Sequence, residues 1–214
     1  MLKIKGGQKG LLNDMLKKYE KPIIQYLLFK NLKLYEAEDI CQEIFLRLSS
    51  DNFLAHAEKR KGKFRTLVLC VVKHAIYDYR NKRPKDVAES SILNDASYID
   101  GNMIDNSIES PEYDESFDKY WAHNLLQNAI SQLKDYSKEK DLPYHEIIIL
   151  KYYDKLSGDE IMNKLALEPK EFYNHTKYAV RKLKIILLEL IKDYSPSGLD
   201  FEEEKETILK YINF

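Results

Sequence analysis

Two carboxylates, Asp39 and Glu43, lie four residues apart in a segment whose apolar residues recur at helical spacing. On a helix both side chains share one face, which is the beginning of a divalent-metal site for phosphodiester cleavage. Catalysis needs further groups at fixed offsets, and no glycine-rich loop, lysine or histidine completes such a set. His74 and Asp78, also four apart, supply two ligands, too few to hold a metal tightly. The sequence therefore favours a protein that is not an enzyme and needs no metal or cofactor.

Length and composition favour a helical protein of the cytoplasm. The chain has 214 residues with seven glycines and six prolines, which leaves little for β-turns or phosphate-binding loops. Two cysteines, Cys41 and Cys70, are too few for a disulfide framework or a zinc knuckle. The longest apolar runs, such as 67–72, are far shorter than the roughly 18 residues that span a bilayer. The first residues lack the apolar stretch of a secretory signal, so we expect a cytoplasmic protein without membrane insertion.

The net charge of −1 conceals blocks of opposite sign. Residues 56–85 carry 10 basic and 2 acidic side chains, whereas residues 86–118 carry 10 acidic side chains and no lysine or arginine. Residues 169–192 are again basic, with 6 basic and 2 acidic side chains. Two cationic surfaces joined by an acidic segment are typical of a protein that binds a polyanion.

Apolar spacing predicts three helices in the first part of the chain. The first covers 11–28 and is interrupted near Pro22, and the second covers 36–48. The third covers 64–83 and ends at Pro84, because the residue before a proline is pushed out of the helical region.

A helix-turn-helix is predicted in the second part of the chain. Ser157 and Glu160 have the spacing of a capping box, which opens a short helix ending near Leu165. Pro169 then opens a longer helix with a basic outer face. A short helix, a brief turn and a longer basic helix form the arrangement with which many proteins read duplex DNA.

Three segments of the first half are AEDICQEIFLRL at 37–48, FRTL at 64–67 and AIYDY at 75–79, the last followed by basic residues. Together they resemble RNA polymerase sigma factors of the extracytoplasmic-function (ECF) type. The first segment resembles the region with which that family grips the clamp helices of the polymerase largest subunit, and the other two resemble the regions that melt and read the promoter minus-ten element.

The second half resembles region four of the same family, which binds the polymerase flap and the minus-thirty-five element. The matching segments are LKYYDKLSGDEI at 150–161, LEP at 167–169 and RKL at 181–183. Ala166 departs from the usual turn glycine, and His175 replaces a commonly basic residue of the recognition helix. The resemblance therefore implies a fold and a function but no promoter sequence.

The resemblance implies an all-α fold with two small helical domains joined by an acidic flexible linker. The expected parts are a sigma region 2 helical bundle over 1–85, the linker over 86–118, a sigma region 4 helix-turn-helix domain over 119–192 and an acidic tail over 193–214. Within the tail, the apolar spacing of 200–214 predicts a further short helix.

The resemblance also implies three sets of binding residues. The polymerase-binding set shares one helix face and comprises Asp39, Gln42, Glu43 and Arg47. The DNA-binding set of region 2 combines cations with aromatic and imidazole rings, which suits a melted strand, and comprises Lys61, Lys63, Arg65, Lys73, His74, Tyr77, Arg80, Lys82 and Arg83. The recognition-helix set comprises Lys170, Asn174, His175, Lys177, Tyr178, Arg181 and Lys182.

The expected function is that of a transcription initiation factor, which binds core RNA polymerase, directs it to promoter DNA and helps to melt the duplex. Its expected partners are core RNA polymerase and promoter DNA, both duplex and melted. An anti-sigma factor and an accessory DNA-targeting protein are further candidate partners. Two alternatives remain open: a helix-turn-helix regulator that acts without binding polymerase, and an enzyme that cleaves nucleic acid.

Overall fold

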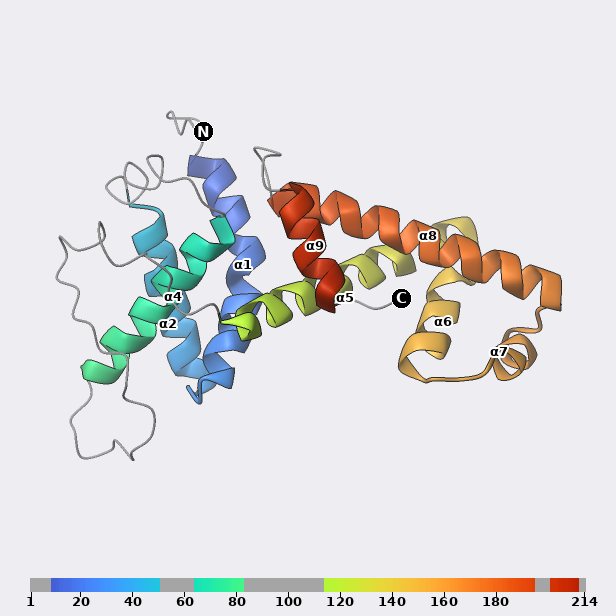
Figure 1. Ribbon diagram of the computed structural model, residues 1–214, viewed down its shortest axis with the longest axis horizontal. Coiled ribbons are helices and arrows are strands. Elements are labelled where there is room, and N and C mark those ends of the chain that lie inside the picture. The colour runs from blue at the N-terminus through green and yellow to red at the C-terminus, as the bar shows by residue number, and fades with distance from the viewer. Residues whose placement is uncertain (1–8, 51–63, 83–113, 195–200, 212–214) are drawn as a thin grey trace. The chain divides into compact units, whose positions relative to one another are not determined.

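The computed structural model describes residues 9–50, 64–82, 114–194 and 201–211, and every regular element among them is helical. The elements in chain order are α1 (Lys9–Phe29), α2 (Leu34–Leu48), α4 (Phe64–Asn81), α5 (Glu115–Lys140), α6 (Tyr144–Ile148), the π-helix η3 (Ile149–Tyr153), α7 (Gly158–Leu165), α8 (Pro169–Tyr194) and α9 (Phe201–Tyr211) (Figure 1). The predicted all-α fold is confirmed for these residues. Most of the predicted linker, from 86 to 113, lies outside them.

The chain divides into two compact units, residues 1–120 and 121–214, which are called unit 1 and unit 2 below. The boundary falls inside α5, between Tyr120 and Trp121.

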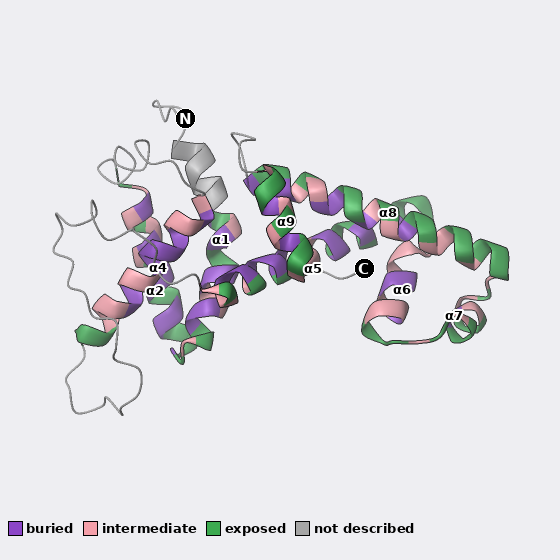
Figure 2. Ribbon diagram, viewed as in Figure 1, coloured by how far each residue is buried: buried purple, intermediate pink, exposed green. Residues whose placement is uncertain are grey.

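Unit 1 is built on α1, α2 and α4, which pack α1 on α2 and α2 on α4. Each helix has a stripe of apolar residues three and four positions apart, and these stripes are the buried faces (Figure 2). The buried apolar residues include Leu16, Tyr19, Ile23, Tyr26 and Leu27 in α1, Ile40, Ile44 and Leu48 in α2, and Val68, Val72 and Ala75 in α4. The helices predicted over 36–48 and 64–83 from apolar spacing correspond to α2 and α4.

Helix α1 runs through Pro22 without a break, so the predicted interruption there is wrong. A proline inside a helix removes one backbone hydrogen bond and usually bends or ends the helix. Here Tyr19 and Ile23 on either side of Pro22 are 1% and 0% exposed. We infer that packing of this stripe outweighs the lost bond.

The beginning of α5 belongs to unit 1. The helix starts at Glu115, inside the expected linker of 86–118, and Phe117 is completely buried. The Phe117 ring meets the ring of Tyr26 edge-on, with 5.5 Å between centroids. Asp114 precedes the helix, and its Oδ1 accepts a hydrogen bond from the Ser116 backbone N–H at 3.0 Å. Residues assigned to the linker for their charge thus pack in a core.

In unit 2, the helices α7 and α8 are joined by a short turn where the sequence predicts a helix-turn-helix. The capping box is confirmed: the Glu160 backbone N–H donates to Ser157 Oγ at 3.3 Å, and the Ser157 N–H donates to Glu160 Oε2 at 2.8 Å. After α7 the chain turns at Ala166, whose φ of 51° lies in the left-handed region that favours glycine. A small core holds α7 and α8 in place, and it comprises Ile147, Leu150 and Ile161 with Leu156, Leu165, Leu167 and Phe172 around them.

The C-terminal segment forms a helix, α9, that packs on α8. Ile208 is its completely buried residue, whereas Leu209 is 46% exposed. None of the described helices is both long and apolar enough to cross a membrane.

Candidate functional site

The outer face of α2 exposes only part of the predicted polymerase-binding set. Asp39 and Gln42 are exposed, whereas Glu43 and Arg47 are half-buried and turn towards α4. Two large apolar side chains lie beside the exposed pair, Tyr35 at 59% and Leu46 at 75% exposure. The sequence analysis did not include them, although positions 35, 39, 42 and 46 share one helical face. Exposed apolar residues next to polar ones are typical of a protein interface.

Arg47 connects α2 to α4. Its Nη2 donates to Glu43 Oε1 at 2.6 Å and to Asp78 Oδ2 at 2.7 Å. Burial lowers the pKa of the guanidinium, but the hydrogen bonds that it donates to both carboxylates outweigh this effect and hold the pKa above its usual value. Arg47 is therefore a permanent cation shared between two acids.

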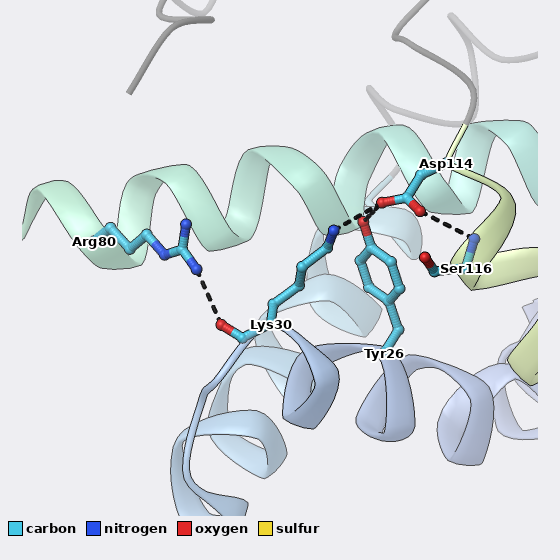
Figure 3. A network of polar contacts seen from close by, with 5 residues as sticks. All are labelled: Tyr26, Lys30, Arg80, Asp114 and Ser116. Atoms are coloured by element: carbon cyan, nitrogen blue, oxygen red, sulfur yellow. Dashed lines mark hydrogen bonds and ion pairs between the residues drawn. The ribbon is translucent and has the colours of Figure 1, made fainter. Parts of the chain in front are cut away.

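Five of the six described members of the predicted region 2 DNA set lie on the outer face of α4 or just after its end. Lys73, His74 and Tyr77 are half-exposed, and Arg80 and Lys82 are exposed. Arg80 Nη2 also donates to the backbone carbonyl oxygen of Lys30 at 3.0 Å, which fixes the end of α4 against α1 (Figure 3). The other predicted members of this face that the structure does not describe are Lys61, Lys63 and Arg83.

His74 is held neutral at pH 7. Burial lowers the pKa of its imidazole, and the nearby Arg47 cation lowers it further, while Asp78 has the opposite effect. The ring therefore offers one donor and one acceptor instead of a positive charge.

Arg65 does not belong to a DNA-binding surface, and this prediction is corrected. Its side chain is 3% exposed, and its Nε lies 3.1 Å from Oδ1 of Asp118, which is equally buried. A charge taken out of water needs a partner, and Asp118 in the first turn of α5 supplies it. In this arrangement Arg65 ties α5 to α4 and is shielded from phosphate.

A second anchor of α5 was not predicted (Figure 3). Asp114 Oδ2 accepts hydrogen bonds from the Tyr26 hydroxyl at 2.5 Å and from Lys30 Nζ at 2.9 Å. Burial would raise the pKa of the Asp114 carboxyl, but these donors and Ser116 hold it well below its usual range. No local sequence signal joins Tyr26 to a residue 88 positions away.

Helix α8 presents most of the predicted recognition-helix set to solvent. The exposed members are Lys170, Asn174, Lys177, Tyr178 and Arg181. Tyr173, which the prediction left out, is 67% exposed on the same part of the helix.

Two members of the predicted recognition-helix set, Lys182 and His175, contact aromatic rings of unit 2. Lys182 Nζ lies 4.3 Å from the centroid of Tyr136 in α5, and the His175 ring lies 5.8 Å from that of Tyr144. Tyr136 and Tyr144 are themselves stacked, with 6.4 Å between centroids. This row of rings fixes the directions of Lys182 and His175 but leaves the five exposed residues free to reach a ligand.

Two acids stand at the start of α8: Glu168 immediately precedes the helix, and Glu171 lies in its first turn. Glu168 and Glu171 are exposed, and Glu171 Oε2 accepts a hydrogen bond from the Glu168 backbone N–H at 3.1 Å. Acids at a helix N-terminus are favourable for the helix dipole but repel phosphate. Any contact of α8 with a nucleic-acid backbone therefore falls to the cations further along the helix.

The described residues show no group that would support metal or thiol chemistry. Among them, no set of three or more histidine, cysteine, aspartate and glutamate side chains could hold a metal ion. Both cysteines are buried, and burial raises the pKa of the Cys41 thiol to about 12, with Glu20 adding to the effect. Cys41 is therefore an unreactive thiol at neutral pH.

No protein-family model matches this chain, and no curated protein gives a significant match.

Proposed function

We propose that this protein is a transcription initiation factor of the sigma type, which binds core RNA polymerase, directs it to promoter DNA and helps to melt the duplex. The observation that carries the proposal is the helix-turn-helix of unit 2, with its cap, its left-handed turn at Ala166 and the exposed face of α8.

The exposed face of α8 has the chemistry of a DNA-reading helix. Lys170, Asn174, Lys177 and Arg181 recur at intervals of three and four residues, so they form one stripe along the helix. The major groove of B-DNA admits an α-helix, in which asparagine pairs with adenine and arginine or lysine pairs with guanine or phosphate. Helix α8 has few cations, and two acids, Glu168 and Glu171, stand at its start, so we expect it to bind DNA weakly by itself. A partner that positions it on DNA would supply the missing affinity.

Unit 1 supports the polymerase part of the proposal through α2. Asp39 and Gln42 form a polar, acidic centre, with Tyr35 and Leu46 exposed beside it. An acidic centre steers association with a basic surface, and large apolar side chains supply contact area. The same unit supports the melting part through α4, where Lys73 and other cations suit phosphates and the Tyr77 ring suits unstacked bases.

The test is transcription reconstituted with purified bacterial core RNA polymerase and a library of promoter sequences. We expect the full chain to bind core polymerase and to direct transcription from a related group of sequences. Asp39→Ala combined with Gln42→Ala should weaken core binding at least tenfold, since these residues form the centre of the exposed α2 face. The matched control is Glu139→Ala combined with Glu206→Ala, which replaces two exposed residues of unit 2 and should leave core binding unchanged.

A regulator that acts without polymerase is the second candidate, because the helix-turn-helix of unit 2 requires no polymerase contact to bind DNA. The same experiment separates the two candidates. Sequence-specific DNA binding by a chain with no affinity for core polymerase would support the regulator and contradict the initiation factor.

A further inference from the structure

Asp78 is the one acidic residue in the sequence of α4, whose other charged residues are Arg65, Lys73 and Arg80. It lies one turn after His74, so it belongs to the face that the proposed function places against the melted strand. An unpaired carboxylate on that face would repel the phosphates that the neighbouring cations attract.

Arg47 of α2 forms an ion pair with the Asp78 carboxylate. Its Nη2 lies 2.7 Å from Asp78 Oδ2 and 2.6 Å from Glu43 Oε1. The three side chains are 34%, 39% and 41% exposed, and ion pairs this open to water add little to stability. We therefore expect these ion pairs to change the charge of the α4 surface more than the stability of the contact between α2 and α4.

We propose that Arg47 works on the DNA side of unit 1 by neutralising Asp78, and that it is a positioning and charge-masking residue instead of a polymerase contact. The inference rests on the proposed function, since it takes α4 as the surface for the melted strand. It reassigns a residue that the sequence places with the polymerase-binding set. The guanidinium stays charged at all physiological pH values, so the masking is constant.

The inference predicts a particular dependence between two substitutions. Arg47→Ala exposes the Asp78 charge and should weaken binding of single-stranded DNA. Asp78→Asn removes that charge, so the double variant should regain the lost affinity. If Arg47 instead touches phosphate or polymerase directly, removing Asp78 restores nothing, because the missing contact is the guanidinium itself.

The experiment measures the affinity of the full chain for a fluorescent single-stranded oligonucleotide and, separately, for core polymerase. At low salt we expect Arg47→Ala to weaken DNA binding about fivefold, the effect of one unit charge a few ångströms from a phosphate in water. The double variant should bind within twofold of the unmodified chain, and Arg47→Lys should keep most of the affinity. Core affinity should stay within twofold throughout, and the DNA effects should fade as salt rises.

Glu43→Gln is the matched control. It removes the charge of the second acid that pairs with Arg47, so that Asp78 is the remaining carboxylate bonded to the guanidinium. DNA affinity in this variant should be unchanged or higher. Thermal unfolding of each variant, followed by circular dichroism, shows that unit 1 remains folded before the affinities are compared.

The outcomes separate this inference from the proposed function. A double variant as weak as Arg47→Ala overturns the masking role. Weakened core binding with unchanged DNA binding overturns it too, and returns Arg47 to the polymerase face with the proposed function intact. An unmodified chain that binds DNA but not core polymerase contradicts the proposed function, while the dependence between Arg47 and Asp78 is still measured. An unmodified chain that does not bind single-stranded DNA overturns the inference.

Discussion

The two units hold their positive charges in different ways. In unit 1, three arginines of α2 and α4 are bonded to protein groups: Arg47 to two carboxylates, Arg65 to Asp118 and Arg80 to a backbone carbonyl oxygen. In unit 2, the cations Lys170, Lys177 and Arg181 stand exposed on α8. Both helices, α4 and α8, have a basic polar face when they are taken alone.

The comparison shows that the cations of a basic helix face can either pair with neighbouring helices or stay exposed for a ligand. Which of the two occurs depends on the helices packed beside that face. In unit 1, Arg47 of α2 pairs with Asp78 of α4, and Arg65 of α4 pairs with Asp118 at the start of α5, so these charges are used to join helices. Arginine suits this use because its planar group offers five donors in a fixed arrangement. The exposed stripe of α8 has no such neighbour among the described residues, and it retains its charge for a ligand.

The largest test of this comparison is the removal of Arg65. Arg65→Ala leaves Asp118 as a buried charge without its main partner, which typically costs about 3–5 kcal/mol of stability. Urea unfolding of the full chain, followed by circular dichroism and fitted for two transitions, measures the effect on unit 1. A loss no greater than that of Arg181→Ala would contradict the distinction between the units. Arg65→Met combined with Asp118→Leu should recover much of the loss, because it removes both charges together.

The next largest effect is expected at Asp114, which anchors the start of α5. Its carboxylate accepts bonds from Tyr26, Lys30 and the Ser116 amide, so Asp114→Ala should cost about 2 kcal/mol, the scale of hydrogen bonds to a charged group. Limited proteolysis in parallel with urea unfolding checks the location, since cleavage near 114–120 should become faster. Unchanged proteolysis together with unchanged stability would show that α5 does not need this anchor.

The same anchor predicts a pH dependence with a definite sign. The pKa of the Asp114 carboxyl is depressed in the folded chain, so its contribution to stability is complete above about pH 4, the ordinary value, and is lost as the pH falls below it. The pKa of the Tyr26 hydroxyl is raised, by burial first and by Asp114 second, so its contribution is lost as the pH rises above about 10. Unfolding curves across pH should show the acid loss in the unmodified chain and a smaller one in Asp114→Asn.

The sequence predicted what depends on neighbours along the chain and missed what depends on distant partners. Ser157 and Glu160 are three positions apart, so their capping box and the start of α7 followed from spacing alone. Tyr26 and Asp114 are 88 positions apart, and no local pattern joins them. The acids around Phe117 suggested a solvated linker, whereas three of their contacts, to Tyr26, Lys30 and Arg65, place the segment against unit 1.

The candidate site shows the same division. Helical spacing correctly placed Asp39 and Gln42 of α2 and the stripe of α8 on exposed faces. It also placed Arg47 with Glu43, because residues four apart share a helix face, but the Asp78 carboxylate that also holds Arg47 comes from α4. Which cations are engaged by acids is a property of the packed unit, and a single helical segment does not contain it.

A smaller loss of stability is expected from the cap of α7, because its hydrogen bond joins an uncharged hydroxyl to a backbone amide three residues away. Ser157→Ala removes the acceptor for the Glu160 amide and should cost about 1 kcal/mol. The loss should appear in the unfolding transition of unit 2 and leave that of unit 1 unchanged. Thr207→Ala in α9 is a matched control for removing a hydroxyl from an exposed position, since its Oγ donates to the Glu203 carbonyl oxygen within a helix. A transition of unit 1 that moved with Ser157→Ala would show that the units do not unfold separately.

The smallest effect on stability is expected from removing the exposed cations of α8. Lys177→Ala and Arg181→Ala remove exposed side chains and should change the free energy of unfolding by less than about 0.5 kcal/mol. Each should nevertheless lower the slope of log affinity against log salt for duplex DNA by about 0.9 if its cation meets a phosphate. Lys182→Ala is the sharper comparison, because its ammonium lies over the Tyr136 ring and its loss should cost about 0.5–1 kcal/mol as well as affinity. If Lys182 and Lys177 behave alike in stability, the ring contact does not hold the lysine, and the division between engaged and free cations fails within α8 itself.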